Sequence, residues 1–291
     1  NRKIFQEKKF PMTVVIPTIG EKNLKDLIDQ IKTSSFVPNE IIIVYPTKEK
    51  VKKINHNFDN VKIIRAPKSG QVAQRAFGIE KAKNNYILQM DADLKIKKDT
   101  IKKLISSFKK FGPKVAVGPK MDFLNETNIE YRGVNLKKWK KFFKVFKGGD
   151  VNIVSKKDPF RYDCWFNEFV QPKVSGYTNI LPGGCILFDK TYYKNFDFYP
   201  FSGKALGEDI LNSIYFQNYG CKLYYEANSK IVHPEPGFYS YDTLKQLFND
   251  LILIYKIKFL ACRLAGGNII RYHTWFCYYT FVTIMKFMLK K

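Results

Sequence analysis

The sequence predicts an α/β fold with a doubly wound, mixed but mainly parallel sheet and helices on both of its faces. Short runs rich in Val and Ile alternate with stretches whose apolar residues have helical spacing, which is the pattern of βαβ units. The runs are continuously apolar, so both faces of each strand are expected to be buried. With 291 residues, of which 45% are hydrophobic, the chain can form one large domain with an appendage.

The first part of the chain alternates strands with helices. Strands are expected at residues 13–17, 40–45, 61–64, 86–90 and 115–118. Helices are expected between them at residues 24–31, 71–82 and 98–111. The last of these helices ends before Gly112 and Pro113, which do not continue a helix. Together these elements predict the nucleotide-binding half of a domain, residues 12–118.

Residues 120–180 mix aromatic, basic and turn residues without a clear period, which is typical of substrate-binding loops. Regular structure resumes with a strand at 186–188, a helix at 208–219 and a strand pair at 223–225 and 230–233. The last fifty residues are expected to be helical. The sequence therefore predicts a catalytic domain at 12–238, with an acceptor-binding half at 119–238, and a C-terminal segment at 239–291.

The composition is strongly basic, with 50 Lys and Arg against 26 Asp and Glu and a formal net charge of +24. This charge favours an anionic partner, namely nucleic acid, an anionic membrane or a phosphorylated substrate. The lysine-rich protein composition that an AT-rich genome encodes also produces such a charge. The five cysteines are widely spaced and form no C-x-x-C pair, which favours reduced thiols in the cytosol over disulfides or zinc. The polar, basic start resembles no signal peptide, so a cytoplasmic protein is expected.

The C-terminal segment has the composition of a membrane surface. No Asp or Glu follows Asp250, while Lys and Arg residues occur at intervals among apolar and aromatic residues. Its most apolar run, 275–285, is far shorter than the roughly 20 residues of a spanning helix. We therefore expect a helical membrane-interface extension, peripheral at the inner face of a membrane. Deleting residues 240–291 is then expected to abolish membrane association without loss of donor hydrolysis.

That segment has an alternative interpretation, in which its helices pack on the catalytic domain or on another subunit. A second basic, aromatic element at 137–147 can likewise face lipid headgroups, or form an ordinary amphipathic helix with solvated lysines. A phosphate-bearing acceptor would use the same charges.

Asp91 and Asp93 form a D-x-D motif directly after the apolar run 86–90. Both carboxylates are thus expected at the carboxyl end of a strand, where open α/β sheets bind ligands. The motif alone also fits a solvated turn. Carboxylate oxygens, however, suit Mg²⁺ or Mn²⁺, and such an ion neutralises charge on a departing diphosphate.

Residues 70–78 (GQVAQRAFG) and 82–93 (AKNNYILQMDAD) resemble glycosyltransferase family 2. The similarity covers about residues 12–235, from Val15–Thr18 to Pro182–Gly184, Gly207–Asp209 and His233. The resemblance implies a GT-A (Rossmann-like) fold and an inverting, metal-dependent transfer of a sugar from a nucleotide-sugar donor.

The resemblance implies a donor site at the strand ends. Pro17 and Thr18 would contact the nucleoside, and Arg75 would reach the base or the diphosphate. Asp91 and Asp93 would hold the ribose, the diphosphate and the Mg²⁺ or Mn²⁺ ion. In the structural alternatives, Arg75 is a surface or salt-bridged residue of a helix, and the glycines of residues 70–78 serve a turn and close helix packing.

One departure concerns the loop after the second strand, where the family commonly has an Asp that recognises the base. This chain has Tyr45, Pro46 and Thr47 instead. Tyr45 can stack on a base or close the core. A UDP-linked sugar remains the expected donor.

Glu208 and Asp209 are expected in the first turn of a helix, where the helix dipole favours carboxylates for structural reasons alone. The resemblance implies that Asp209 is the catalytic base, which takes a proton from the acceptor hydroxyl. Glu208 is the rival base. No second catalytic acid is needed, unlike in a glycoside hydrolase, because the metal stabilises the leaving diphosphate.

Four further residues are expected near the acceptor and the metal. Gly183 and Gly184 would form an acceptor-side loop, and Trp165 is a candidate sugar-stacking platform or a core residue. His233 ends a strand pattern; the resemblance implies that it would complete the metal shell, and the alternative is a structural histidine.

The expected partners are a nucleotide-sugar, a glycan or lipid-linked acceptor from polysaccharide biosynthesis, and an anionic membrane, but no nucleic acid. A membrane- or nucleic-acid-binding module would explain the charge, but not acidic residues at strand and helix ends. A nucleotidyltransferase usually has a Gly-rich, basic loop after its first strand, which residues 18–21 (TIGE) lack.

Overall fold

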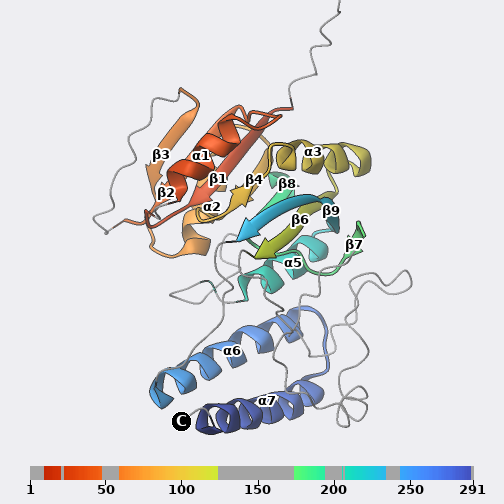
Figure 1. Cartoon of the computed structure of the whole chain (residues 1–291). Helices are drawn as coiled ribbons and strands as arrows, with labels where there is room; N and C mark the ends of the chain where they lie inside the picture. Colours follow the sequence, from red (N-terminus) through yellow and green to blue (C-terminus); the bar gives the residue numbers. More distant parts are fainter. Residues whose placement is uncertain are drawn as a thin grey trace, which may run out of the picture.

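The structure is a computed structural model that describes residues 10–20, 23–47, 59–123, 174–193, 205, 207–233 and 243–289. Its centre is a nine-stranded sheet in the order β3-β2-β1-β4-β8-β6-β9-β5, with β7 paired to β9 (Figure 1). The mixed sheet and its flanking helices confirm the predicted fold class.

Four parallel strands form the first half of the sheet. They are β1 (Met12–Pro17), β2 (Glu40–Tyr45), β3 (Val61–Arg65) and β4 (Tyr86–Met90). β1 lies between β2 and β4, with Val15 opposite Ile42 and Gln89. The predicted strands thus lie side by side with their carboxyl ends at one edge.

The second half of the sheet is mixed. Its strands are β5 (Lys95–Ile96), β6 (Val115–Phe123), β7 (Gly176–Thr178), β8 (Cys185–Asp189) and β9 (Lys222–His233), and a short 3-10 helix, η1 (Lys190–Tyr192), follows β8. β8 is antiparallel to β4 and β6, whereas β6 and β9 are parallel. The antiparallel β8 places its amino end beside the carboxyl end of β4.

The predicted strand pair at 223–225 and 230–233 is wrong, because β9 is one strand with an irregularity in its middle. The register to β6 shifts between Pro119 and Lys120, where Glu226 and Lys230 are the successive partners. Glu226 stabilises the bulge by accepting a hydrogen bond from Ser107 Oγ at 2.5 Å and one from the amide of Asn228 at 3.0 Å. The polar residues of this bulge therefore have the sequence pattern of a turn between two strands.

Two apolar cores lie on opposite faces of the sheet. One contains the buried residues of α1 (Leu24–Lys32) and α3 (Thr100–Phe111). The other contains those of α2 (Gln71–Lys81), α5 (Glu208–Asn218) and α6 (Leu244–Leu264). α2 lies especially close to the sheet, since a Cβ at Gly78 would stand 2.5 Å from Val15 Cγ1. The close-packing interpretation of this glycine is confirmed.

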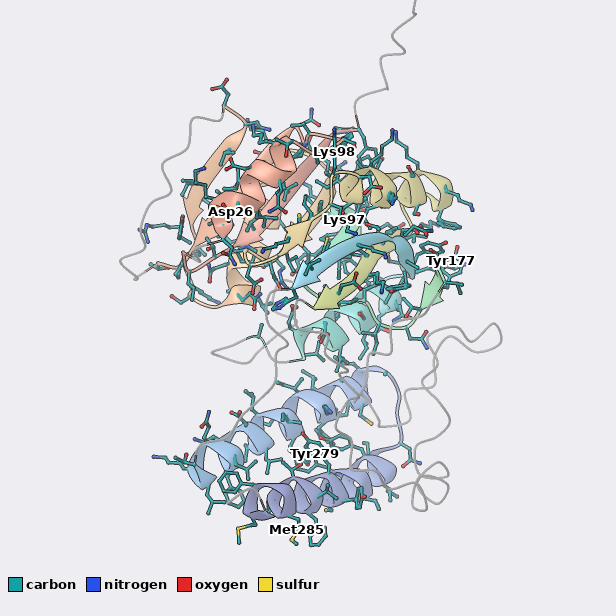
Figure 2. All side chains as sticks on the ribbon, in the orientation of Figure 1. Asp26, Lys97, Lys98, Tyr177, Tyr279 and Met285 are labelled. Carbon is teal, nitrogen blue, oxygen red and sulfur yellow. The ribbon has the colours of Figure 1, made fainter. Side chains whose placement is uncertain are left out.

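α6 and α7 (Ile269–Leu289) form a C-terminal helical hairpin beside the sheet domain (Figure 1). Ile257 and Ala261 of α6 belong to the same buried core as α5. α7 packs on α6, where the Tyr272 hydroxyl donates a hydrogen bond to the Tyr255 carbonyl at 2.6 Å. Tyr279 points between the two helices, whereas Met285 points away from α6 (Figure 2). Within the described residues, no helix is long and apolar enough to cross a membrane.

Candidate active site

The carboxyl end of β4 is joined to the loop that precedes β8. The Asp91 amide donates to the Gly184 carbonyl at 2.8 Å, and Gln89 Nε2 donates to the Gly183 carbonyl at 2.6 Å. The predicted D-x-D motif and the predicted acceptor-side glycines are therefore neighbours. Gln89 was not among the expected site residues, although a buried amide in an apolar strand is a signal that such a group has a partner.

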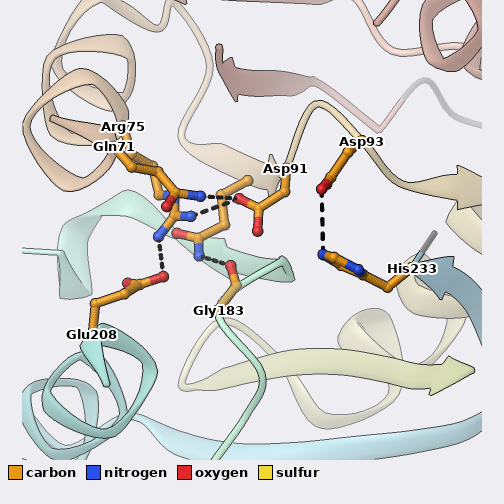
Figure 3. A network of polar contacts seen from close by, with 8 residues as sticks. Gln71, Arg75, Asp91, Asp93, Gly183, Glu208 and His233 are labelled. Carbon is orange, nitrogen blue, oxygen red and sulfur yellow. Dashed lines mark hydrogen bonds and ion pairs between the residues drawn. The ribbon is translucent and has the colours of Figure 1, made fainter. Parts of the chain in front are cut away.

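A buried ion-pair network lies at this junction (Figure 3). Arg75, whose side chain is 1% exposed, contacts Asp91 Oδ1 through Nη2 at 2.7 Å and Glu208 Oε1 through Nη1 at 2.6 Å. Gln71 Nε2 donates to the same Asp91 oxygen at 2.9 Å. Burial lowers the pKa of Arg75, but the charges of Glu208 and Asp91 outweigh it and raise that pKa overall. The salt-bridged alternative for Arg75 is the arrangement in the structure.

The two glycines allow close approach of the acidic side chains. A Cβ on Gly183 would stand 2.3 Å from Glu208 Oε1 and 3.4 Å from Asp209 Cβ. A Cβ on Gly184 would stand 3.2 Å from Asp91 Oδ2. The backbone of this loop therefore passes close to the side chains of both Asp91 and Glu208.

Glu208 and Asp209 begin α5, as predicted, after Gly207, whose φ of 61° is left-handed. Asp209 Oδ1 accepts a hydrogen bond from the Ile210 amide at 2.9 Å. Burial, and then the neighbouring charge of Glu208, raise the pKa of Asp209 to about 6. A carboxylate with that pKa is ionised at neutral pH yet basic enough to accept a proton. Glu208, in contrast, is paired with the buried Arg75.

Asp93 and His233 approach each other across the sheet edge, with Asp93 Oδ2 3.4 Å from His233 Nε2 (Figure 3). Their side chains are 35% and 23% exposed, so solvent and ligands reach both. Asp91 points away from this pair, toward Arg75 (Figure 3). Among the described residues, no three His, Cys, Asp or Glu side chains form a group that could hold a metal. The structure thus brings together two of the three predicted metal ligands.

The remaining donor-site residues lie at the ends of β1 and β2. The Thr18 amide donates to the Val44 carbonyl at 3.0 Å, and the Thr18 carbonyl accepts from Gln74 Nε2 at 2.9 Å. Pro17 is buried beside Thr18 as the last residue of β1. Tyr45 is 2% exposed and lies in the core with α1 and α3, which leaves almost no ring surface for a base to stack on. Trp165 and the basic element at 137–147 lie outside the described residues.

Two solved glycosyltransferase structures are similar to this one. Residues 1–349 of TarS from S. aureus, in complex with UDP-GlcNAc, give a TM-score of 0.53 at 14% identity, over 86% of this chain and 66% of that chain. GalNAc-T7 with UDP, GalNAc and Mn²⁺ gives a TM-score of 0.51 at 15% identity, over 84% of this chain and 48% of that chain. This chain therefore spans less than two thirds of either protein. These similarities show a GT-A fold.

The family model described as glycosyl transferase family 2 matches residues 13–165, more than half of the chain. The chain belongs to this family, and the resemblance predicted from residues 70–93 is confirmed. The matched range contains Arg75, Asp91 and Asp93, whereas Asp209 and His233 lie beyond it. Among curated protein sequences, none matches this chain.

Proposed function

We propose that the chain transfers a sugar, with inversion, from a nucleotide-sugar to a hydroxyl group of a glycan or lipid-linked acceptor. The observation that carries this proposal is the buried Arg75, which joins Asp91, after β4, to Glu208, beside Asp209 at the start of α5. Asp209 directly follows Glu208, which Arg75 joins to Asp91. A donor held by Asp91 and the base would then lie at the same junction.

In the proposed reaction, Asp209 accepts the proton of the acceptor hydroxyl while its oxygen attacks the anomeric carbon. The bond from that carbon to the diphosphate oxygen breaks as the new glycosidic bond forms, so the configuration inverts. Glu208 remains paired with Arg75 and does not compete for the proton. One positioned base of matched pKa contributes about 10²- to 10⁴-fold to such a step.

Asp93 and His233 fit a Mn²⁺ or Mg²⁺ ion, because one carboxylate oxygen and one imidazole nitrogen stand 3.4 Å apart at a ligand-accessible edge. Hard divalent ions often take only one or two protein ligands and complete their shell with phosphate and water. When bound, the ion would neutralise charge on the leaving diphosphate. Asp91, held by Arg75 and Gln71, is better placed for a donor hydroxyl.

The expected donor is a UDP-sugar. TarS and GalNAc-T7 were solved with UDP-GlcNAc and with UDP and GalNAc respectively, which supports this class. Tyr45 is packed in the core and does not replace the base-recognising Asp of the family. Base recognition would then fall to the backbone near Thr18, where Gln74 fixes the carbonyl.

The acceptor is proposed to lie at an anionic membrane, with which the protein associates peripherally. α7 exposes Ile270, Phe281, Met285 and Met288, whose exposed fractions are 79%, 63%, 43% and 59%. These four residues form the apolar stripe of α7. No acidic residue occurs after Asp250, so nothing of like charge on this segment opposes anionic headgroups.

The test is a thermal-shift screen of UDP-, GDP- and TDP-sugars with and without Mn²⁺, on the native chain and on Asp93→Ala. One nucleotide-sugar is expected to raise the melting temperature only with Mn²⁺ and only in the native chain. The matched control is Asp99→Ala, which removes an exposed carboxylate just before α3. Incubation with that donor and a panel of acceptors, followed by NMR of the anomeric proton, then reports the configuration of the product.

Product with retained configuration would exclude the role proposed for Asp209. A folded native chain that no sugar nucleotide stabilises would instead favour a binding module. Release of pyrophosphate from a nucleoside triphosphate would favour a nucleotidyltransferase, the other alternative.

A further inference from the structure

The side chains of β9, the strand that carries His233, change face in the middle of the strand. Before the irregularity, Leu223 and Tyr225 belong to the core that contains α5, whereas Tyr224 packs against the core of α1 and α3. After it, Ile231 lies in the core of α1 and α3. Odd-numbered residues of β9 have thus moved from one face of the sheet to the other.

The cause is the bulge of β9, which consists of residues 227–229. The neighbouring strand β6 keeps its alternation, because Val117 and Met121 both pack in the core of α1 and α3. On β9, Glu226 and Lys230 pair with successive residues of β6, so the bulge adds three residues between them. Side chains alternate between the faces of a strand, so an insertion of odd length reverses the face of every residue that follows.

His233 is one of the residues whose face is reversed. It follows Ile231 by two positions and therefore lies on the same face of β9. Val232 pairs with Lys95 of β5, which holds this end of β9 beside the segment that follows Asp93. Asp93 Oδ2 is then 3.4 Å from His233 Nε2 (Figure 3). In an uninterrupted ladder, His233 would point to the opposite face of the sheet.

Glu226 anchors the first end of the bulge. Its side chain accepts hydrogen bonds from Ser107 Oγ at 2.5 Å and from Ser175 Oγ at 2.8 Å. It also accepts one from the Asn228 amide at 3.0 Å and one from Asn228 Nδ2 at 3.1 Å. Burial raises the pKa of Glu226, but these hydrogen bonds outweigh it and lower that pKa overall. The carboxylate therefore joins the bulge to α3 and to the residue before β7.

Thr100 of α3 anchors the second end. Ser229 Oγ donates to the Thr100 carbonyl at 3.1 Å, and Thr100 Oγ1 donates to the Lys230 carbonyl at 2.7 Å. Ser229 and Thr100 are both buried. Thr100 and Ser107 lie about two turns apart on α3. One helix therefore holds the bulge at both ends.

We infer that Glu226 is a positioning residue of the proposed metal site, which holds the bulge of β9 and so sets the face on which His233 meets Asp93. This inference rests on the proposed function, in which Asp93 and His233 bind Mn²⁺ or Mg²⁺. Glu226 acts through the backbone of β9. A carboxylate suits this role, because hydrogen bonds to a charged acceptor are stronger than those between neutral groups.

A cross-link tests the position of His233 without metal, donor or activity. Asp93→Cys and His233→Cys are combined in the full chain, a short bifunctional thiol reagent is added, and peptide mass mapping measures the rate at which positions 93 and 233 become linked. Adding Glu226→Ala is expected to slow this link about tenfold, and Glu226→Gln, which keeps an acceptor oxygen, to recover most of the rate. Ser107→Ala removes one hydrogen bond only and is expected to slow the link about threefold.

The matched control for the cross-link is Glu40→Ala. Glu40 is buried to the same extent as Glu226, and it accepts hydrogen bonds from Thr13 Oγ1 at 2.8 Å and from the Lys83 amide at 3.0 Å. This substitution is expected to destabilise the fold without slowing the link. A native rate in both Glu226→Ala and Ser107→Ala, or equal slowing in Glu40→Ala, would overturn the inference.

Mn²⁺ binding then tests the effect on the metal site. Electron paramagnetic resonance measures the Kd for Mn²⁺ in the presence of UDP, GDP or TDP. Glu226→Ala is expected to raise this Kd about tenfold, but to have no further effect in a His233→Ala background. An equal rise in both backgrounds would contradict a role through His233. A native chain that binds no Mn²⁺ would refute the proposed metal site, while the cross-link still decides whether Glu226 positions His233.

Discussion

Arg75 shows how much one residue can organise. A buried guanidinium that holds two carboxylates fixes the end of β4 against the start of α5, and Glu208 is 133 residues from Arg75 in the sequence. Removal of one partner of a buried ion pair leaves an uncompensated charge, which costs far more than the pair itself contributes. Arg75 is therefore expected to support both stability and the geometry of the site.

Arg75→Met is expected to lower the free energy of unfolding by about 3 kcal/mol, because Glu208 and Asp91 lose their shared cation. Urea denaturation monitored by circular dichroism measures this change. Lys103→Met removes an exposed ion pair with Asp99 on α3 and should cost less than about 0.5 kcal/mol. Equal effects of the two substitutions would show that the buried network is not a special source of stability.

Asp209 is expected to make both activity and stability depend on pH. Because its folded-state pKa is raised to about 6 from the usual range near 4, its protonated form is favoured in the folded protein. The stability that Asp209 contributes is then complete below about pH 4 and is lost as the pH rises through about 6. The proposed base, in contrast, becomes active over this same rise.

Asp209→Asn is accordingly expected to reduce kcat by roughly a thousandfold and to raise the melting temperature at pH 7.5, with a smaller rise at pH 4. Calorimetry at the two pH values and a donor-transfer assay measure the two effects. Asp26→Asn, on an exposed position of α1, should change neither. A melting temperature that falls at pH 7.5 would indicate that the carboxylate is stabilised in the folded state instead.

At the scale of elements, the distance between α2 and the sheet sets the position of Arg75. Gly78 faces β1 and β2 so closely that a Cβ would lie 2.5 Å from Val15 Cγ1 and 2.7 Å from Val44 Cγ2. A methyl group there must push the helix outward or force the valines from their rotamers. Either response moves the guanidinium of Arg75, which lies three residues before Gly78 on the same helix.

Gly78→Ala is expected to destabilise the fold by about 1–3 kcal/mol and to weaken Mn²⁺-dependent donor binding. Combined with Val44→Ala, which makes room, it should cost less than the sum of the two single substitutions. Glu80→Ala, on the exposed face of the same helix, is the control. Additive effects in a double-mutant cycle would mean that the helix and the sheet adjust independently.

At the scale of the whole molecule, the hairpin has two different surfaces. Its inner surface shares a core with α5 through Ile257 and Ala261, and its outer surface is the apolar stripe of α7. Deletion of residues 240–291 would expose that core. The expectation that truncation leaves donor hydrolysis intact is therefore revised, because the truncated domain is expected to be destabilised. Substitutions on the stripe separate membrane binding from folding.

Phe281→Ser combined with Met285→Ser is expected to lower binding to phosphatidylglycerol vesicles roughly tenfold, because two exposed apolar side chains no longer enter the interface. Vesicle co-sedimentation measures the binding, and a thermal melt confirms that the double variant folds. Val174→Ser removes an apolar side chain that is 67% exposed and lies outside α7, and should leave binding unchanged. Binding equal to the native chain would favour a protein partner or no partner for the stripe.

Local patterns in the sequence determined the strands, most helices and the edge at which the site lies. Residues 12–17, 40–45 and 86–90 are apolar enough to be buried on both faces, so Asp91 and Asp93 had to follow a buried strand at a ligand-binding edge. The glycine at position 78 could be assigned to close packing on the same basis. These properties depend on neighbours in sequence, which a single sequence displays.

Only the tertiary structure decided which distant side chains meet. The order of strands places β8 antiparallel beside β4 and β9 beside β5, and this order brings Glu208 to Arg75 and His233 to Asp93. No local pattern encodes such pairs, because the sheet order results from how all the apolar faces pack together. For the same reason no local pattern shows that Ile257 of α6 packs against α5, which only the tertiary structure reveals.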